Sequence, residues 1–304
     1  MKEREEFERM KELMSKYDSD SEIAITRTPK VISELEEKYT RLELIGEGGM
    51  AKVHRANTIE NGKQVVWKEA APSRFNPLPE VNRRLLDESE ILSNLDHPRI
   101  PKYIDSGEIQ NDNGENVVVM IMEFIEGRSL KDDIETLAKL GKGFDSNEAI
   151  EIISKICLSL EYMADLEVPV YHRDIKPANI IIENNRGPIL SDFGLAKGVD
   201  AGVGLSLSGG IHTAGWGPPE RENGDTGGYT DVYSLGQLLW HMLTNERAGI
   251  HSEENRITKI EENGHPRWVA DLINKAVVPD DPNKRIQSAF EFRIRLENEG
   301  NYQE

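Results

Sequence analysis

One segment of this chain carries more structural information than any other: Tyr171-His172-Arg173-Asp174-Ile175-Lys176-Pro177-Ala178-Asn179-Ile180. Eighteen positions after Asp174 comes a second motif, Asp192-Phe193-Gly194. Each polar residue alone would be read as a solvated loop side chain, and a tripeptide such as Asp-Phe-Gly arises easily by chance. The two motifs at this spacing do not, so we interpret them as parts of one site.

A glycine-rich segment lies upstream, between two predicted strands: Ile45-Gly46-Glu47-Gly48-Gly49-Met50-Ala51-Lys52-Val53. Glycines at such a position let backbone N–H groups approach phosphate groups without a side chain in the way. Taken alone, this segment fits a simple hairpin turn equally well. Ala51 stands where the third glycine of the pattern is expected, and it should stiffen the loop slightly.

A lysine, Lys68, follows on the next predicted strand, fifteen residues after Val53. A lysine on a strand is usually a solvated edge charge. Its position behind the glycine-rich segment favours a contact with phosphate instead.

The hydrophobic pattern divides the chain into a strand-rich part and a helix-rich part. From Tyr39 to Met122 most segments read as strands, Asn61-Gly62 signals a hairpin, and one helix is predicted over residues 79–95. Further helices are predicted over residues 130–140, 146–166, 229–243, 268–276 and 287–298. A small sheet-rich lobe should therefore precede a larger helical lobe.

These motifs, in this order, resemble those of the eukaryotic-type serine/threonine protein kinases, with a pattern nearest to the bacterial and archaeal members. The resemblance covers roughly residues 39–298 and implies an α+β, bilobal protein-kinase fold. That fold has a small antiparallel sheet lobe with one long helix and a larger, mainly helical lobe. We predict an N-terminal helical extension at 1–38, an ATP-binding lobe at 39–126, and a catalytic, peptide-binding lobe at 127–304.

The resemblance also implies roles for the polar residues. Asp174 would orient the substrate hydroxyl and accept its proton, and Lys176 would neutralise charge on the γ-phosphate. Lys68 would contact the ATP phosphates. Asn179 and Asp192 would hold Mg²⁺ or Mn²⁺, because hard divalent cations prefer oxygen ligands such as carboxylates and amides.

The remaining ATP contacts follow from the same resemblance. Glu88, on the predicted helix 79–95, is expected to pair with Lys68, with Glu90 as its rival. Met122 would guard the back of the adenine pocket, and the adenine edge would bond to the backbone of Glu123 and Ile125. The expected nucleotide-binding residues are Ile45, Gly46, Gly48, Gly49, Val53, Val66, Lys68, Glu88, Met122, Glu123, Ile125, Asn179 and Asp192.

Other motif positions concern the scaffold and the substrate. Lys176 is typical of enzymes that act on Ser or Thr. So is Thr213, which the resemblance implies is in contact with Asp174. Glu220 is expected to pair with Arg285, although the motif before it reads Pro-Pro-Glu rather than Ala-Pro-Glu. Asp231 should hold the backbone of the His-Arg-Asp motif from beneath.

We therefore expect a kinase that moves the γ-phosphate of ATP onto Ser or Thr of proteins, its own chain included. Between Asp192 and Glu220 a phosphorylation switch is expected at Ser206 or Ser208, paired with Arg173. The alternative for this segment is a flexible serine-glycine loop without regulation. The alternative for the whole chain is a pseudokinase scaffold that binds partners without phosphate transfer, but such proteins usually lack one of three residues that are all present here: Lys68, Asp174 and Asp192. A kinase for small molecules fits less well, because the Thr213–Glu220 segment looks suited to peptides.

The composition limits the possible partners. Asp and Glu total 55 against 37 Lys and Arg, a net charge of −18. That balance argues against nucleic-acid binding, which needs a basic surface, and is compatible with basic protein substrates. A merely solubilising surface, or one suited to high salt, would carry the same charge. The single cysteine, Cys157, lies in an apolar stretch and is predicted to be buried, without an internal disulfide.

The ends and apolar runs bear on location. The longest apolar run, beginning at Val117, is too short to cross a bilayer, and the first residues lack the apolar core of a signal peptide. We therefore expect a cytoplasmic protein. The hydrophobic pattern of residues 1–17 predicts an amphipathic helix. Three alternatives remain open for this segment: it packs on the small lobe of its own chain, it binds another protein, or it stays disordered. Substrate identity, upstream signal and oligomeric state do not follow from the sequence.

Overall fold

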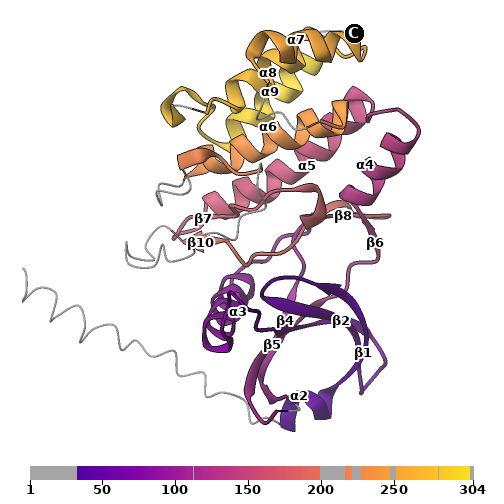
Figure 1. The fold of residues 1–304 in the computed structure, drawn as a ribbon, viewed down its shortest axis with the longest axis vertical. Coiled ribbons are helices and arrows are strands. Elements are labelled where there is room, and N and C mark those ends of the chain that lie inside the picture. The colour runs from indigo at the N-terminus through magenta and orange to yellow at the C-terminus, as the bar shows by residue number, and fades with distance from the viewer. Residues whose placement is uncertain are drawn as a thin grey trace, which may run out of the picture.

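The computed structural model describes residues 33–111, 113–198, 216–220, 227–246, 251–279 and 281–301. The predicted helix over residues 1–17 and the candidate phosphorylation sites Ser206, Ser208 and Thr213 lie outside these residues. In the described part the strand-rich portion and the helix-rich portion form two separate lobes (Figure 1). The predicted bilobal α+β architecture is confirmed.

The first lobe is built on a five-stranded antiparallel sheet in the order β1-β2-β3-β5-β4. Its strands are β1 (Tyr39–Glu47), β2 (Ala51–Thr58), β3 (Gln64–Ala70), β4 (Tyr103–Gln110) and β5 (Asn116–Glu123). Gly62, with φ 69°, lies in the β2–β3 hairpin, where an ordinary side chain would be strained. Val53 and Lys68 are cross-strand partners, so their side chains lie on the same face of the sheet.

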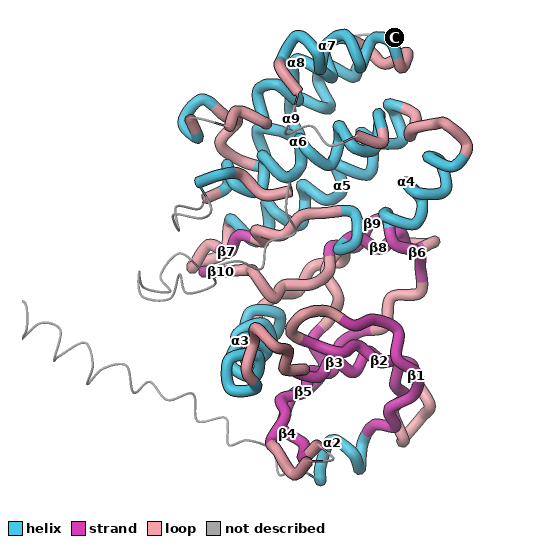
Figure 2. The backbone as a smooth tube through the Cα atoms, in the orientation of Figure 1, coloured by secondary structure: helices cyan, strands magenta, loops and turns pink. Residues whose placement is uncertain are grey.

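Two helices pack on this sheet. The longer, α3 (Leu78–Ser93), buries Val81, Leu85, Glu88, Ser89 and Leu92, which recur at helical spacing on one face. The shorter, α2 (Ser33–Lys38), places Leu35 in the same core. Figure 2 shows α3 beside the sheet and α2 at its far end. The boundary predicted at residue 38 stays a prediction.

The second lobe is mainly helical. It contains α4 (Leu130–Lys139), α5 (Ser146–Ala164), α6 (Gly228–Thr244), α7 (Glu253–Glu262), α8 (Arg267–Ala276) and α9 (Ala289–Asn301). Helix α6 lies at its centre, with most of its residues buried. Short strands β6 (Gly127–Ser129), β8 (Ile180–Glu183) and β9 (Gly187–Leu190) form a sheet on the side that faces the first lobe (Figure 2). A further pair joins β7 (Val170–Tyr171) to β10 (Lys197–Gly198).

Helix α7 was not predicted from the sequence. Only Arg256 and Ile260 are buried among its ten residues, so it lacks a readable apolar stripe. Its start is set by Ser252, whose side chain accepts a hydrogen bond from the backbone N–H of Asn255. The short strands of this lobe were also missed, because two to four residues carry too little periodicity to be recognised.

The core of the helical lobe contains Cys157, fully buried as predicted. Burial raises the pKa of its thiol, so the thiolate is disfavoured. Among the described helices, none has both the length and the apolar character that a membrane crossing requires.

Candidate active site

A cavity of about 870 Å³ lies between the two lobes. It is lined by every residue predicted to bind ATP or to act in catalysis. The glycine-rich turn and the sheet form its roof, α3 lies at its back, and the loops after β7 and β9 form its floor. The sequence motifs are therefore brought together around one space, although they span residues 45 to 192.

The roof is the turn between β1 and β2, closed by a hydrogen bond from Gly48 N–H to Ala51 O at 2.9 Å. A Cβ added at Gly48 would lie no closer than 3.9 Å to another atom, and one added at Gly49 would meet nothing within 4 Å. Neither glycine has a positive φ. Because the fold itself tolerates a side chain at both positions, the glycines fit a bulky group that lies close beneath the backbone.

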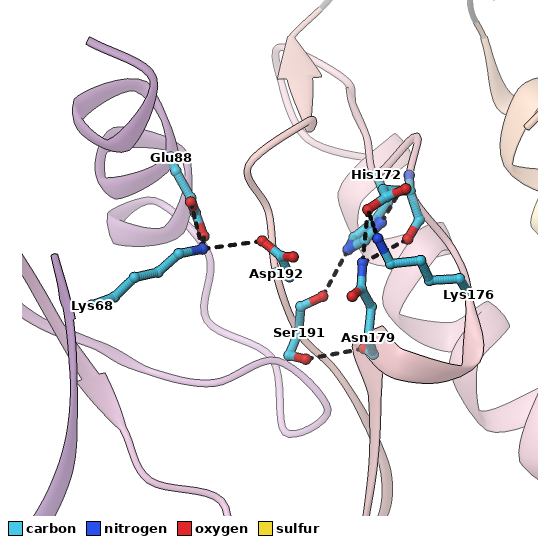
Figure 3. A network of polar contacts seen from close by, with 8 residues as sticks. Lys68, Glu88, His172, Lys176, Asn179, Ser191 and Asp192 are labelled. Carbon is cyan, nitrogen blue, oxygen red and sulfur yellow. Dashed lines mark hydrogen bonds and ion pairs between the residues drawn. The ribbon is translucent and has the colours of Figure 1, made fainter. Parts of the chain in front are cut away.

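The back of the cavity holds a buried ion pair (Figure 3). Lys68 Nζ lies 2.6 Å and 2.8 Å from the carboxylate oxygens of Glu88 and 3.0 Å from Asp192 Oδ1. Glu88 is 4% exposed, whereas its rival Glu90 faces solvent. The pairing predicted for Lys68 is thus made by Glu88, and Lys68 connects the sheet, α3 and the Asp-Phe-Gly motif.

The charges of this cluster stabilise each other. Burial opposes the charge on Lys68, but the carboxylates of Asp192 and Glu88 outweigh it and raise the Lys68 pKa. The positive charge of Lys68 in turn lowers the pKa of Asp192 to about 2. Both groups are therefore ionised at neutral pH.

The floor is formed by the loop after β7. Lys176 Nζ lies 2.7 Å from Asp174 Oδ2, and the Asn179 side-chain amide donates to Asp174 O at 2.8 Å and to Oδ2 at 3.0 Å. Figure 3 shows the side chains of Lys176 and Asn179 close together, with dashed lines for their contacts. The Asn179 backbone carbonyl accepts hydrogen bonds from Ser191, so the floor is tied to the segment that carries Asp192.

The floor is held from beneath by Asp231 of α6, as predicted. Its buried carboxylate accepts hydrogen bonds from the backbone N–H groups of His172, at 2.9 Å, and Arg173, at 2.7 Å. Arg173 has a φ of 66° and Asp192 a φ of 63°, both in the left-handed region that most residues avoid. These conformations cost free energy and persist because the surrounding bonds hold them in place.

The predicted scaffold pair is also present. The guanidinium of Arg285 makes a two-pronged contact with the Glu220 carboxylate, with Nη2 and Oε2 2.9 Å apart. It also lies over the ring of Tyr233, with Cζ 4.8 Å from the ring centroid. Thr213, the predicted contact of Asp174, lies outside the described residues.

The donor set fits a magnesium ion carried in with a phosphate ligand. Within the described residues no group of three or more His, Cys, Asp or Glu side chains is placed to hold a metal by itself. Asp192 and Asn179 can supply one carboxylate and one amide oxygen, and Asn179 Oδ1 accepts no hydrogen bond from a described residue. Mg²⁺ commonly takes one or two protein oxygens and completes its shell with phosphate and water.

Several lining residues were missed by sequence reasoning: Met50, Arg84, Ala178, Ile181, Ser191 and Leu195. Arg84 could have been found, because it precedes Glu88 by four residues and so lies on the same face of α3. Ile181 lies on β8, just after the short 3₁₀ helix that ends at Asn179, and no signal in the sequence marks it as a wall residue. No signal in the sequence distinguishes Met50 from any other loop residue.

Comparison with known proteins agrees with this geometry. The protein kinase domain family matches residues 39–290. Serine/threonine-protein kinase PknB of Mycolicibacterium smegmatis is 30% identical over 275 residues, covering 86% of this chain and 43% of that protein. PknB of Mycobacterium tuberculosis is 30% identical over 280 residues, covering 87% and 43%. A probable serine/threonine-protein kinase of Clostridium perfringens is 31% identical over 272 residues, covering 86% and 38%.

This chain thus spans less than half the length of these curated relatives. The matched region, in contrast, includes both lobes and all the residues that line the cavity. The chain belongs to the protein kinase family.

Proposed function

We propose that this chain is an active kinase that transfers the γ-phosphate of ATP to Ser or Thr hydroxyls of proteins, its own chain included. The observation that carries the proposal is the contact of Lys68 with both Glu88 and Asp192. Lys68 is the cation proposed to bind the phosphates. These contacts connect it to Glu88 on α3 and to Asp192, the carboxylate proposed to bind the metal, within one cavity. The relatives named serine/threonine kinases support the choice of acceptor.

The residues divide the reaction between them. Asp174 orients the acceptor hydroxyl and takes its proton, and Lys176, 2.7 Å from that carboxylate, is placed to stabilise charge on the transferred group. Lys68 holds the phosphates, and Asp192 with Asn179 holds the metal. When bound, Mg²⁺ supplies positive charge to the phosphate oxygens. The arrangement acts by position and electrostatics, because little covalent chemistry is asked of the protein.

The partners follow from the same reaction. ATP is the phosphate donor and Mg²⁺, or Mn²⁺, the metal. We place the domain in the cytoplasm, where ATP is supplied. The net charge of −18 favours basic protein substrates through long-range attraction.

The test is phosphate transfer from γ-labelled ATP to a basic protein, with Mg²⁺ and with excess chelator. We expect label on Ser and Thr of the substrate and of the chain itself, and none when the metal is removed. Binding of magnesium-ADP without any transfer would make the chain a pseudokinase and overturn the proposal. Label recovered only on tyrosine would overturn the choice of acceptor.

A further inference from the structure

The second half of the glycine-rich turn, Gly49 and Met50, accepts hydrogen bonds from neighbouring segments. Asn76 Nδ2 donates a hydrogen bond to Gly49 O at 3.1 Å, and Ala71 N–H donates to Met50 O at 2.9 Å. Arg84 Nη1 lies 3.1 Å from Met50 Sδ, a weak acceptor. The roof of the cavity is thus attached to α3 and to the connection that precedes it.

Asn76 is held in place by contacts other than the one it makes with the roof. It is 5% exposed and sits in a tight turn in which Ser73 and Asn76 exchange backbone hydrogen bonds of 2.9 Å and 3.2 Å. Its amide also donates to Ser73 Oγ at 3.2 Å. Pro77 follows and caps α3, which restricts the backbone further. The donor that faces Gly49 is therefore already fixed in direction.

Arg84 connects the roof to the body of α3. Its side chain is 13% exposed and lines the cavity, and its Nε donates to Glu80 Oε1 at 2.7 Å. Glu88, which holds Lys68, lies one turn further along the same face. One rigid helix thus contacts both the roof, through Arg84, and the phosphate-binding lysine, through Glu88.

We propose that Asn76 and Arg84 are positioning residues that hold Gly49 and Met50 over the nucleotide phosphates. Through them the glycine-rich turn and Lys68 keep a common position relative to α3. This inference rests on the proposed function, because it needs a nucleotide in the cavity. Losing either contact leaves a turn that must be ordered when nucleotide binds, and that ordering weakens affinity.

The experiment measures magnesium-ADP binding by calorimetry in the folded chain and in three variants. Asn76→Ala removes the donor without adding a charge beside the Gly49 carbonyl or the nucleotide phosphates. Arg84→Met removes the contact with Met50. Arg83→Met is the matched control, because Arg83 pairs with the same Glu80 and with Asp87 but has no bond to the turn.

We expect N76A and R84M each to bind magnesium-ADP roughly threefold to tenfold more weakly, and R83M to stay within about twofold. In steady-state transfer the KM for ATP should rise by the same factor, while kcat changes little. A residue with a merely structural role would lower kcat through the fraction of folded protein and would not move KM alone.

The outcomes separate this inference from the proposed function. If the wild-type chain binds no magnesium-ADP, the proposed function fails. If the wild type binds and N76A and R84M bind as tightly as R83M, the positioning role is wrong. Thermal melting without nucleotide accompanies each titration. Should a variant be unfolded, Asn76→Ser and Arg84→Gln, which keep a polar side chain at each position, decide the question by the same criterion.

Discussion

The floor and the roof of the cavity are built in opposite ways. In the floor, the backbone of His172 and Arg173 is bonded to the buried carboxylate of Asp231, and Arg173 is kept in the left-handed region. In the roof, a Cβ added at Gly49 would meet open space, and one added at Gly48 would make only an ordinary van der Waals contact. The conformation of the floor is therefore fixed by hydrogen bonds from a neighbouring helix, whereas the position of the roof depends on a few contacts made by Gly49 and Met50.

This difference reflects two physical requirements. Groups that stabilise developing charge act best when they are positioned before the reaction, because no reorganisation is then needed. A cover over a nucleotide must instead admit and release it, and glycines keep its backbone adaptable. Substitutions can alter the floor, the roof or the connection between them separately.

The largest effect is expected in the floor, from Asp174→Asn. Loss of a positioned general base typically costs about 10²–10⁴-fold in rate. The amide keeps the shape of the side chain, so the melting temperature should change little. Labelled phosphate transfer and thermal melting measure the two quantities; wild-type turnover would show that Asp174 is not the base.

A second change to the floor concerns the metal. Asp192→Ala should raise the Mg²⁺ concentration for half-maximal activity by roughly 100-fold and Asn179→Ala by roughly tenfold, because a carboxylate brings a full charge and an amide only a dipole. Activity is followed across a magnesium titration. Equal shifts in the two variants would contradict the unequal roles.

Lys68→Met removes the side chain that connects the sheet and α3 to the Asp-Phe-Gly motif. It leaves the buried Glu88 without its cation, which should cost about 3 kcal/mol of unfolding free energy at pH 8. Burial already raises the pKa of Glu88 above its ordinary 4.5. Without Lys68 the folded-state pKa rises further, so the folded state binds the extra proton and stability falls as pH increases from about 5.

Urea unfolding at pH 5 and pH 8 measures this dependence. K68M should recover part of its lost stability at pH 5 relative to wild type, while a K68M, E88Q double variant should not. Asp192 loses the same cation, and the K68M, E88Q double variant, in which Asp192 is unchanged, separates its contribution from that of Glu88. An equal deficit at both pH values would show that Glu88 is not the group that titrates.

The smallest effect is expected in the roof, from Gly49→Ala. An alanine fits the open space, so stability without nucleotide should rise by about 0.4–1 kcal/mol through a less flexible unfolded chain. Affinity for magnesium-ADP should fall several-fold, because the methyl group occupies space near the phosphates. Melting and calorimetry on one sample separate the effects; unchanged affinity would place the nucleotide elsewhere.

The floor and the roof also differ in how much of each could be predicted from the sequence. The polar residues of the floor were found because the chemistry restricts both residue type and spacing, and Asp174, Asn179 and Asp192 follow one another closely. Arg84 and Asn76 were not found, because their importance depends on a turn and a helix meeting a loop more than twenty residues earlier. Apolar wall residues such as Ile181 carry no chemical signature and are recognised only when the cavity is seen.

The sequestered thiol of Cys157 makes this molecule convenient for spectroscopic labelling. It is the single cysteine of the chain and is fully buried, and its raised pKa disfavours the thiolate that reacts with labels. A second cysteine placed on the surface would therefore be the sole reactive handle in the native protein. Phe75, 83% exposed and next to Asn76, is a suitable position. A fluorophore at this position would report movement beside the glycine-rich turn without background from the core.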